Sequence, residues 1–340
     1  MRRHFHTMLA VALLALAAAC GGDSEPAAQP PTAGGTGSEQ AAGDERADWP
    51  DRIVLGLVPS READVLIENA QPLADALAER LDIEVESFVP QDYTGLTEAM
   101  ATGQADIGAF GPLAIVRAQE RAGVEFIAQS ERFGSATYHT QYMTNAPDKY
   151  CSDEPVADDD GYLSCNGTAE ADEGPVGEDV IAQIDGTLAY VDPSSASGYL
   201  IPALQMQQAG IDLSSLDTIF AGGHDSSAIA VYNGDVEVGL SFDDARTTVA
   251  EEFPDIGEQV VVFAYSAEIP NDGFTVRGDL PESLKTAITD ALLEYAGTEE
   301  GTEVLQSIYE IDALLPADDA ALDVVREADA ELGDLIEDEG

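Results

Sequence analysis

Short apolar runs of strand length alternate with segments of helical periodicity along most of this chain. The first run, RIVLGLV, is followed by apolar residues at helical spacing, and the pattern then repeats. In order, the expected elements are a strand at 52–58, a helix at 62–80, a strand at 83–89, a helix at 94–102, a strand at 105–110 and a helix at 112–121. Repeated strand–helix units of this kind predict an open, mostly parallel sheet covered by helices on both faces.

The same alternation returns after an acidic insert at residues 146–178. The expected strands here are 186–191, 218–221, 236–242, 259–265 and 274–277, and the expected helices are 198–209, 226–232 and 244–253. Residues 282–340 are expected to be almost entirely helical. Because a helical stretch cannot form a sheet alone, we expect it to pack on the first α/β unit.

The length of the chain suits two α/β lobes, since about 290 residues follow the N-terminal segment and a single core rarely grows larger. We expect lobe 1 to comprise residues 51–138 and 268–340, and lobe 2 residues 139–267. The chain would then cross between the lobes twice, near 137–142 and near 266–272.

The N-terminal segment has the order of an export signal. Arginines precede an apolar stretch that ends at Ala19 and is shorter than the ~20 residues of a membrane-spanning helix. Cys20 directly follows small residues, which resembles the lipobox of bacterial lipoproteins. We expect residues 1–19 to be a cleaved signal peptide, 20–50 a solvated linker without large apolar residues, and Cys20 the lipid anchor to the outer face of the cell membrane. The alternative is an ordinary secretory signal with an incidental cysteine.

The charge of the chain is strongly acidic. It has 14 Lys and Arg against 66 Asp and Glu, a formal net charge of −52. Such a surface excludes nucleic acid as a partner, because phosphate backbones are bound by clustered Lys and Arg. Acids spread over the whole chain indicate a salt-tolerant, halophilic habitat, since salt screens their repulsion. A cation-binding surface is the alternative, and it is disfavoured because the acids do not gather in one block.

Two further cysteines, Cys151 and Cys165, flank part of the acidic insert. In an exported protein they are expected to form a disulfide. Metal binding is not expected, because neither CxxC spacing nor a nearby histidine accompanies them. The consecutive aspartates 158–160 do not alternate as a calcium-binding loop requires, so we interpret them as solvated.

Two segments that follow expected strands carry groups suited to an anion. DPSSASGY at 192–199 opens a helix and combines hydroxyls, backbone N–H groups and the positive end of the helix dipole. Its alternative interpretation is a simple serine N-cap, which accounts for one serine but poorly for three. GGHDSS at 222–227 holds His224, which could donate to an anion or be incidental. In open α/β sheets ligands bind at such strand ends.

Several segments, taken in order, resemble the PhnD-type phosphonate, phosphite and phosphate-binding proteins of ABC importers. They are FVPQDYTGL, GQADIGAFGP, YVDPSSASGYLIPALQM, FAGGHDSSAIAVYNGDVEVGLSF and EIPNDGFTVR. The resemblance runs from about Arg52 to the C-terminus. It implies a bilobal type II periplasmic-binding-protein fold, with two α/β lobes joined by two crossover segments and the ligand cleft between them.

The resemblance also implies which residues hold the oxyanion. The family's Ser-Thr-Ser cradle falls on Ser195, Ala196 and Ser197, followed by Gly198, and its histidine falls on His224. Alanine at 196 is a departure that removes one hydroxyl donor. A small ligand with fewer acceptor oxygens, such as phosphite or a short phosphonate, is therefore favoured slightly over phosphate.

The remaining implied contacts are aromatic and acidic. The aromatic pair of the cleft falls on Tyr93 and Tyr138, and the acids that face an ammonium in aminophosphonate binders fall on Asp243 or Asp244 and on Asp272. A carboxylate beside a bound anion is tolerable only if it accepts a proton or faces a cation. We therefore expect sulfate to be excluded.

The leading hypothesis is a lipid-anchored substrate-binding protein that presents a phosphorus oxyanion to an ABC permease and its ATPase. We expect a monomer that needs no cofactor or metal and is not an enzyme. A hydrolase of phosphorylated substrates is disfavoured, because the chain has no GxSxG motif, no expected free cysteine and no histidine cluster. A ligand-sensing lipoprotein of the same fold is the other alternative.

Overall fold

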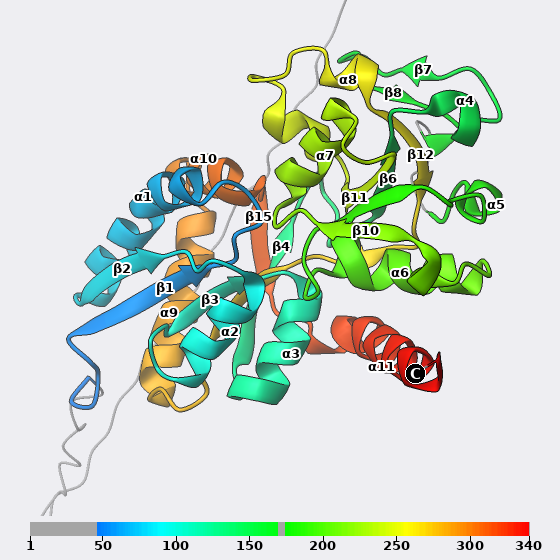
Figure 1. The fold of residues 1–340 in the computed structure, drawn as a ribbon. Coiled ribbons are helices and arrows are strands. Elements are labelled where there is room, and N and C mark those ends of the chain that lie inside the picture. Colours follow the sequence, from blue (N-terminus) through cyan, green and yellow to red (C-terminus); the bar gives the residue numbers. More distant parts are fainter. Residues whose placement is uncertain (1–45, 169–173, 340) are drawn as a thin grey trace, which may run out of the picture. The chain divides into compact units, whose positions relative to one another are not determined.

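The computed structural model describes residues 46–168 and 174–339, with side chains to 333. The expected signal peptide, Cys20 and all but the last five residues of the linker lie outside the described residues, as does part of the acidic insert. The described chain forms two mixed sheets with helices packed on them, joined by a two-stranded ribbon (Figure 1). This α/β architecture confirms the predicted fold class.

The first sheet is the core of lobe 1. It has six strands in the order β15-β4-β14-β3-β1-β2, of which β1 pairs in parallel with β2 and β3 and β14 runs antiparallel to β3 and β4. Its elements are β1 (Arg52–Leu57), α1 (Ala63–Leu81), β2 (Glu84–Phe88), α2 (Tyr93–Ala101), β3 (Ile107–Phe110), α3 (Pro112–Ala122), β4 (Glu125–Glu131), β14 (Gly273–Val276), α9 (Glu282–Ala296), α10 (Glu299–Tyr309), β15 (Ala313–Pro316), η5 (Asp319–Leu322) and α11 (Asp323–Glu339).

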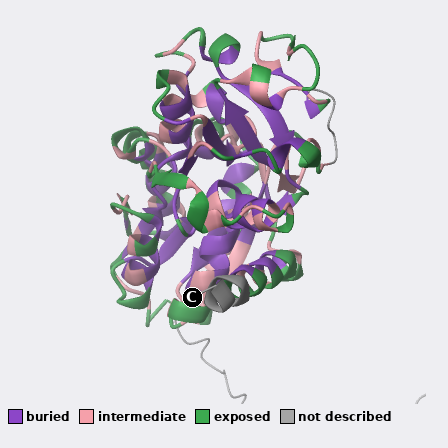
Figure 2. Ribbon diagram, turned by 45° about the vertical axis from the view of Figure 1, so that its right-hand side comes forward, coloured by how far each residue is buried: buried purple, intermediate pink, exposed green. Residues whose placement is uncertain are grey.

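Burial explains why these segments form strands and helices. The strand β1 buries Ile53, Leu55 and Leu57 completely, and α1 turns Leu66 and Leu73 onto the sheet at helical spacing. Figure 2 shows that buried residues follow the strands of both lobes, whereas exposed residues gather on the outer sides of the helices. Each sheet is therefore the centre of its own lobe.

The second sheet is the core of lobe 2. It has seven strands in the order β10-β9-β11-β6-β12-β8-β7. Its elements are β6 (Thr140–Thr144), α4 (Pro147–Tyr150), β7 (Val156–Ala157), β8 (Leu163–Ser164), α5 (Glu178–Ile181), β9 (Thr187–Tyr190), η2 (Ala196–Leu200), α6 (Ile201–Gln208), η3 (Leu213–Ser215), β10 (Asp217–Phe220), α7 (His224–Asn233), β11 (Val238–Phe242), η4 (Ala245–Val249), α8 (Ile256–Gln259) and β12 (Val261–Tyr265).

A two-stranded ribbon of β5 (Thr137–Tyr138) and β13 (Ile269–Pro270) lies where the chain passes from one sheet to the other. Both strands fall within the expected crossover segments. The C-terminal helix α11 contacts α3 of lobe 1 and α6 of lobe 2, so it is a further contact between the lobes (Figure 1).

Several sequence-based expectations about the elements were wrong. Neither sheet is mostly parallel, because β14 and β15 pair antiparallel in the first sheet and β6 pairs antiparallel with both of its neighbours in the second. Residues 282–340 are not almost entirely helical, because β15 adds a strand to the edge of lobe 1 beside β4. The strand β4 was not expected at all, since EFIAQSE carries too few apolar residues to show a strand pattern. The expected helix at 244–253 is only the short 3-10 helix η4.

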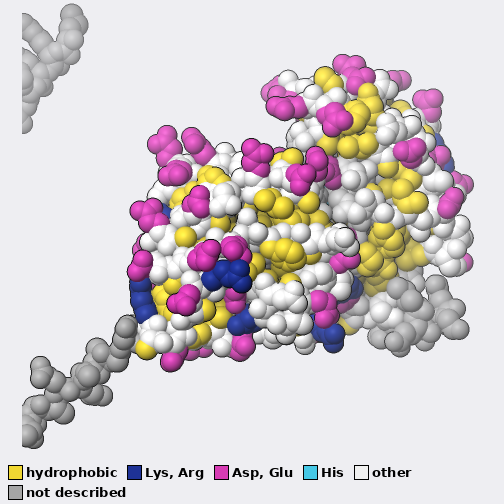
Figure 3. All heavy atoms as spheres, turned by 60° about the vertical axis from the view of Figure 1, so that its left-hand side comes forward, with side chains coloured by type: hydrophobic (Ala, Val, Ile, Leu, Met, Phe, Trp, Pro, Cys, Tyr) yellow, Lys and Arg dark blue, Asp and Glu magenta, His cyan; other side chains and the backbone are white. Residues whose placement is uncertain are grey.

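The acidic insert extends the sheet of lobe 2. Its hairpin of β7 and β8 pairs with the edge of β12, and Cys151 and Cys165 are joined by a disulfide. Acidic side chains are scattered over the face drawn in Figure 3, with few Lys and Arg between them. Among the described helices, none has the length and apolar character to cross a bilayer.

Candidate functional site

A cavity of about 80 Å³ lies between the two lobes. Lobe 1 contributes residues that follow β1, β3 and β4, and lobe 2 contributes residues that follow β9, β10 and β11. The predicted residues that the structure brings together in its wall are Tyr93, Tyr138, Ser195, Ala196, Ser197, His224, Asp243 and Asp272. Two predicted residues, Gly198 and Asp244, do not line it.

The size of the cavity restricts what it can hold. A water needs roughly 10–15 Å³ on the same measure, so the cavity offers about five to eight water-sized positions. A phosphorus oxyanion with a short substituent fits that space. A drug-sized ligand, which needs roughly 300 Å³ or more, does not.

The cradle is the start of the π-helical segment η2. Ser195 caps it: its Oγ accepts from the Gly198 N–H at 3.0 Å, and its carbonyl accepts from Leu200 N–H at 3.1 Å. The backbone N–H groups of Ala196 and Ser197 have no acceptor among the described residues. They are therefore free to donate to an anion at the positive end of the helix.

Gly198 shapes the cradle without lining it. A Cβ at this position would lie 2.4 Å from the Val191 side chain, so only glycine lets η2 pack against the strand β9 and the residue after it. The aromatic pair lies around the cradle. Burial raises the pKa of the Tyr138 hydroxyl, which is hydrogen-bonded to Ser197, and burial also raises the pKa of Tyr93. Both tyrosines are thus neutral donors at physiological pH.

His224 is a neutral donor as well. Burial, with a smaller contribution from Arg61, lowers its pKa to about 3. Its Nδ1 lies 2.9 Å from the Ser241 hydroxyl and accepts from the Phe242 N–H at 3.3 Å. A backbone N–H can only donate, so the ring proton must be on Nε2. That N–H has no acceptor among the described residues, and its ring lines the cavity.

The three predicted acids have different environments. Asp272 is bound through both oxygens by Arg132, at 2.7 and 2.8 Å. Asp244 is likewise occupied by Arg246, whose guanidinium is almost completely buried, so the prediction of Asp244 as a ligand contact is not supported by its position. Only Asp243 lines the cavity without an Arg or Lys partner in the described chain.

Sequence reasoning missed a second set of charged residues in the wall. Arg132 and the Arg61–Glu310 ion pair, 2.8 Å apart, come from loops of lobe 1. The wall therefore carries three carboxylates and two guanidinium groups, with neutral His224. Their signal in the sequence was weak, although Arg61 does follow the first strand, where a ligand contact is expected.

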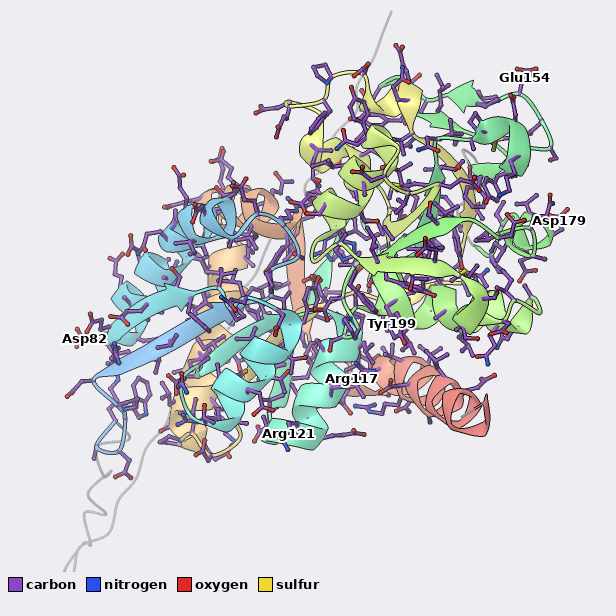
Figure 4. All side chains as sticks on the ribbon, in the orientation of Figure 1. Asp82, Arg117, Arg121, Glu154, Asp179 and Tyr199 are labelled. Atoms are coloured by element: carbon purple, nitrogen blue, oxygen red, sulfur yellow. A yellow bond between two sulfur atoms is a disulfide. The ribbon has the colours of Figure 1, made fainter. Side chains whose placement is uncertain are left out.

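The lobes touch directly around the cavity. The Asp192 carboxylate of lobe 2 binds the backbone of Tyr93 at the start of α2 in lobe 1, and its Oδ1 accepts from the Ser194 N–H at 2.7 Å. Burial raises the pKa of this carboxyl group. The backbone N–H of His224 donates to the Ser60 carbonyl at 2.9 Å. Arg117, labelled in Figure 4, reaches from α3 to the Pro193 carbonyl at 2.7 Å. Residues beside the cradle thus connect the two lobes.

The arrangement of polar groups in the wall suits the binding of a small anion. Hydroxyls and N–H groups converge on one small cavity, and in the described chain no cluster of three His, Cys, Asp or Glu side chains could hold a metal ion. Fold and cavity define a two-lobed protein that encloses a small ligand between its lobes, as periplasmic binding proteins do.

Comparison with known proteins gives the family. Residues 55–322 match the family described as ABC transporter, phosphonate, periplasmic substrate-binding protein, and the chain belongs to this family. The chain is 32% identical over 253 residues to the phosphate-import protein PhnD of Mycolicibacterium smegmatis, covering 72% of this chain and 67% of the relative. It is 24% identical over 256 residues to the phosphonates-binding periplasmic protein of Escherichia coli, covering 75% and 69%.

A solved structure supports the same fold. PhnD1 from Prochlorococcus marinus in complex with methylphosphonate superimposes with a TM-score of 0.70 at 17% identity, covering 84% of this chain and 99% of that chain. The predicted family, the type II periplasmic-binding-protein fold and the role as substrate-binding component of an ABC importer are confirmed.

Proposed function

We propose that the cavity binds a phosphonate, phosphite or phosphate in singly charged or zwitterionic form and delivers it to an ABC permease with its ATPase. The observation that carries the proposal is the convergence of neutral donors on one small cavity. The donors are the N–H groups of Ala196 and Ser197, the hydroxyls of Ser195, Ser197 and the tyrosines, and the Nε2–H of His224.

Neutral donors resolve the apparent conflict between an anion ligand and a charge of −52. The acids on the surface are screened by salt over a few ångströms at high ionic strength, about 3 Å at 1 M. Hydrogen-bond donors that line a small cavity act at contact distance, where ions in solution screen them little. Local geometry therefore determines binding.

Asp243 determines which form of the anion is accepted. Because Asp272 is neutralised by Arg132 and Asp244 by Arg246, only Asp243 presents an uncompensated carboxylate to the ligand. A ligand with a P–OH or an ammonium group can satisfy it, and a fully ionised sulfate cannot. We propose that Asp243 is the residue that rejects sulfate.

Membership of this family supports a protein that works outside the cytoplasm. The small residues directly before Cys20 support lipid attachment at that cysteine. We propose that residues 51–138 and 268–340 act as one lobe and 139–267 as the other, that the chain works as a monomer, and that the cavity binds without catalysis. Ser241, whose hydroxyl lies 2.9 Å from Nδ1 of His224, does not line the cavity, which favours transport over hydrolysis.

The test is calorimetry on the purified chain in high salt with methylphosphonate, phosphite, phosphate and sulfate. We expect the phosphorus ligands to bind without turnover and sulfate to bind at least about tenfold more weakly, the loss expected for one unsatisfied charged contact. Ser197→Ala should weaken the phosphorus ligands, while the exposed control Ser214→Ala should not. Sulfate binding as tightly as the phosphorus ligands would contradict the assignment of Asp243.

A further inference from the structure

The acidic insert is connected to the cavity residue Asp243 through the side chain of His139. His139 immediately precedes β6, is almost completely buried, and contacts Asp243, which lines the cavity. On its other side is Gly174, in the returning part of the insert. The insert, the imidazole and the cavity carboxylate are thus in consecutive contact.

The hydrogen bonds of His139 fix its tautomer. The Gly174 N–H donates to Nε2 at 3.3 Å, so Nε2 must be an acceptor and the proton of the neutral ring must be on Nδ1. Nδ1 faces Oδ2 of Asp243 at 3.5 Å, and the His139 backbone N–H donates to Oδ1 at 2.9 Å. One carboxylate oxygen therefore accepts a hydrogen bond from His139, and the other lies in a longer contact with its imidazole.

The insert holds the imidazole from two directions. A Cβ on Gly174 would lie 1.9 Å from the Ser266 carbonyl oxygen, so the backbone here is packed as closely as glycine alone permits. Two residues on, Val176 forms a bridge with Tyr265 through both backbone groups. The Tyr265 ring stacks on His139 with 5.6 Å between ring centres. The insert thereby fixes the plane of the imidazole as well as its Nε2.

A second attachment holds the residue next to Asp243. Arg246 binds Asp244 and donates from Nη1 to the carbonyls of Leu163, in the insert, and Val260, each at 2.7 Å. The ring of Tyr162, also in the insert, lies 5.1 Å from its guanidinium carbon. The loop that carries Asp243 is therefore anchored to the insert on both sides.

We propose that the insert positions the Asp243 carboxylate through His139 and so sets the preference of the cavity for ligands that carry an ammonium group. The inference rests on the proposed function, because it assigns a role within that binding site. His139 acts as a positioning residue and does not touch the ligand. An insert that merely enlarges lobe 2 would leave ligand preference unchanged.

The experiment compares aminomethylphosphonate with ethylphosphonate, which have the same number of heavy atoms and differ in an ammonium against a methyl group. Calorimetry on the full chain gives the ratio of their affinities. For the wild type we expect the ammonium ligand to bind more tightly. His139→Gln keeps an acceptor for Gly174 but loses the donor to Asp243, and it should lower the ratio by about fivefold or more.

His139→Asn and Gly174→Ala test the insert itself. The asparagine keeps a donor near Asp243 but loses the contact with Gly174, and the alanine displaces the Gly174 backbone. Both should lower the ratio while ethylphosphonate affinity stays within about threefold of wild type, since the cradle is untouched. The control Ser152→Ala, an exposed contact elsewhere in the insert, should change neither value.

The possible outcomes separate the two proposals. A ratio unchanged in His139→Gln overturns the positioning role, and a ratio lowered in His139→Gln but unchanged in His139→Asn and Gly174→Ala overturns the role of the insert. Wild type that binds both ligands equally overturns the inference and leaves oxyanion binding intact. Wild type that binds neither ligand, nor phosphite or phosphate, overturns the proposed function.

Discussion

The neutral state of His224 makes the stability of the protein depend on pH in a defined window. Its pKa is lowered from 6.5 to about 3 in the folded chain. Between these values the unfolded chain binds a proton that the folded chain does not, so stability rises with pH across this window and falls as the pH drops below about 6.5. At pH 4.5 protonation of His224 in the unfolded chain lowers the free energy of unfolding by roughly 3 kcal/mol, at about 1.4 kcal/mol for each pH unit.

The perturbation that isolates this effect is His224→Asn. The amide oxygen can replace Nδ1 as acceptor for Ser241 and the Phe242 N–H, but asparagine carries no titrating group and lacks the Nε2–H. The variant should therefore lose the pH dependence of His224. It should also bind the oxyanion ~10–150-fold more weakly, because a hydrogen bond to a charged group contributes about 1.5–3 kcal/mol.

The assay is urea unfolding of both proteins at pH 8 and pH 4.5 at fixed high salt. Carboxylates titrate in both proteins, so the difference between wild type and variant reports His224 alone. On going from pH 8 to pH 4.5, wild type should lose about 3 kcal/mol more than the variant. Equal losses would refute the neutral, buried imidazole, and with it the assignment of Nε2–H as the ligand donor.

Two further outcomes follow from the site and the N-terminal segment. Arg132→Met should weaken phosphonate binding at least about tenfold, because it leaves the charge of Asp272 uncompensated near the anion. The double variant Arg132→Met/Asp272→Asn should recover part of this loss of affinity. A double variant that binds as weakly as the single one would contradict the pairing of Arg132 with Asp272. Cys20→Ser should move the protein from the detergent phase to the aqueous phase in a partition assay, and unchanged partition would contradict lipid anchoring.

The sequence predicted the fold and the helix start at residues 192–199 because both depend on local patterns. Alternating apolar runs produce the two sheets, and the run of serines before Gly198 forms the start of η2. Which of the predicted acids are neutralised by an arginine could not be predicted from local patterns. Asp272 is neutralised by Arg132, 140 positions earlier in the chain, and such a pair is visible only in three dimensions.

Two other features of the structure could not be predicted from the sequence for related reasons. The strand β4 contains Glu125, Gln129 and Glu131, so it lacks the alternation of a half-buried strand, and neighbours on both sides stabilise it in the sheet. The insert was recognised by its composition and its cysteines. Its connection to Asp243 depends on Gly174 and His139, which have no sequence pattern in common.

The strand order of lobe 1 also has a consequence for the order of events during synthesis. The strand β14 lies between β3 and β4 and pairs with both, yet it follows the whole of lobe 2 in the chain. As the chain emerges from the ribosome, β3 and β4 must wait for about 140 residues before their shared neighbour appears. The strands of lobe 2 lie within one continuous stretch, so this later lobe is the first that can complete its sheet. A nascent chain that has emerged only as far as Asp272 would then hold a complete sheet in lobe 2, while β4 of lobe 1 still lacks its partners β14 and β15.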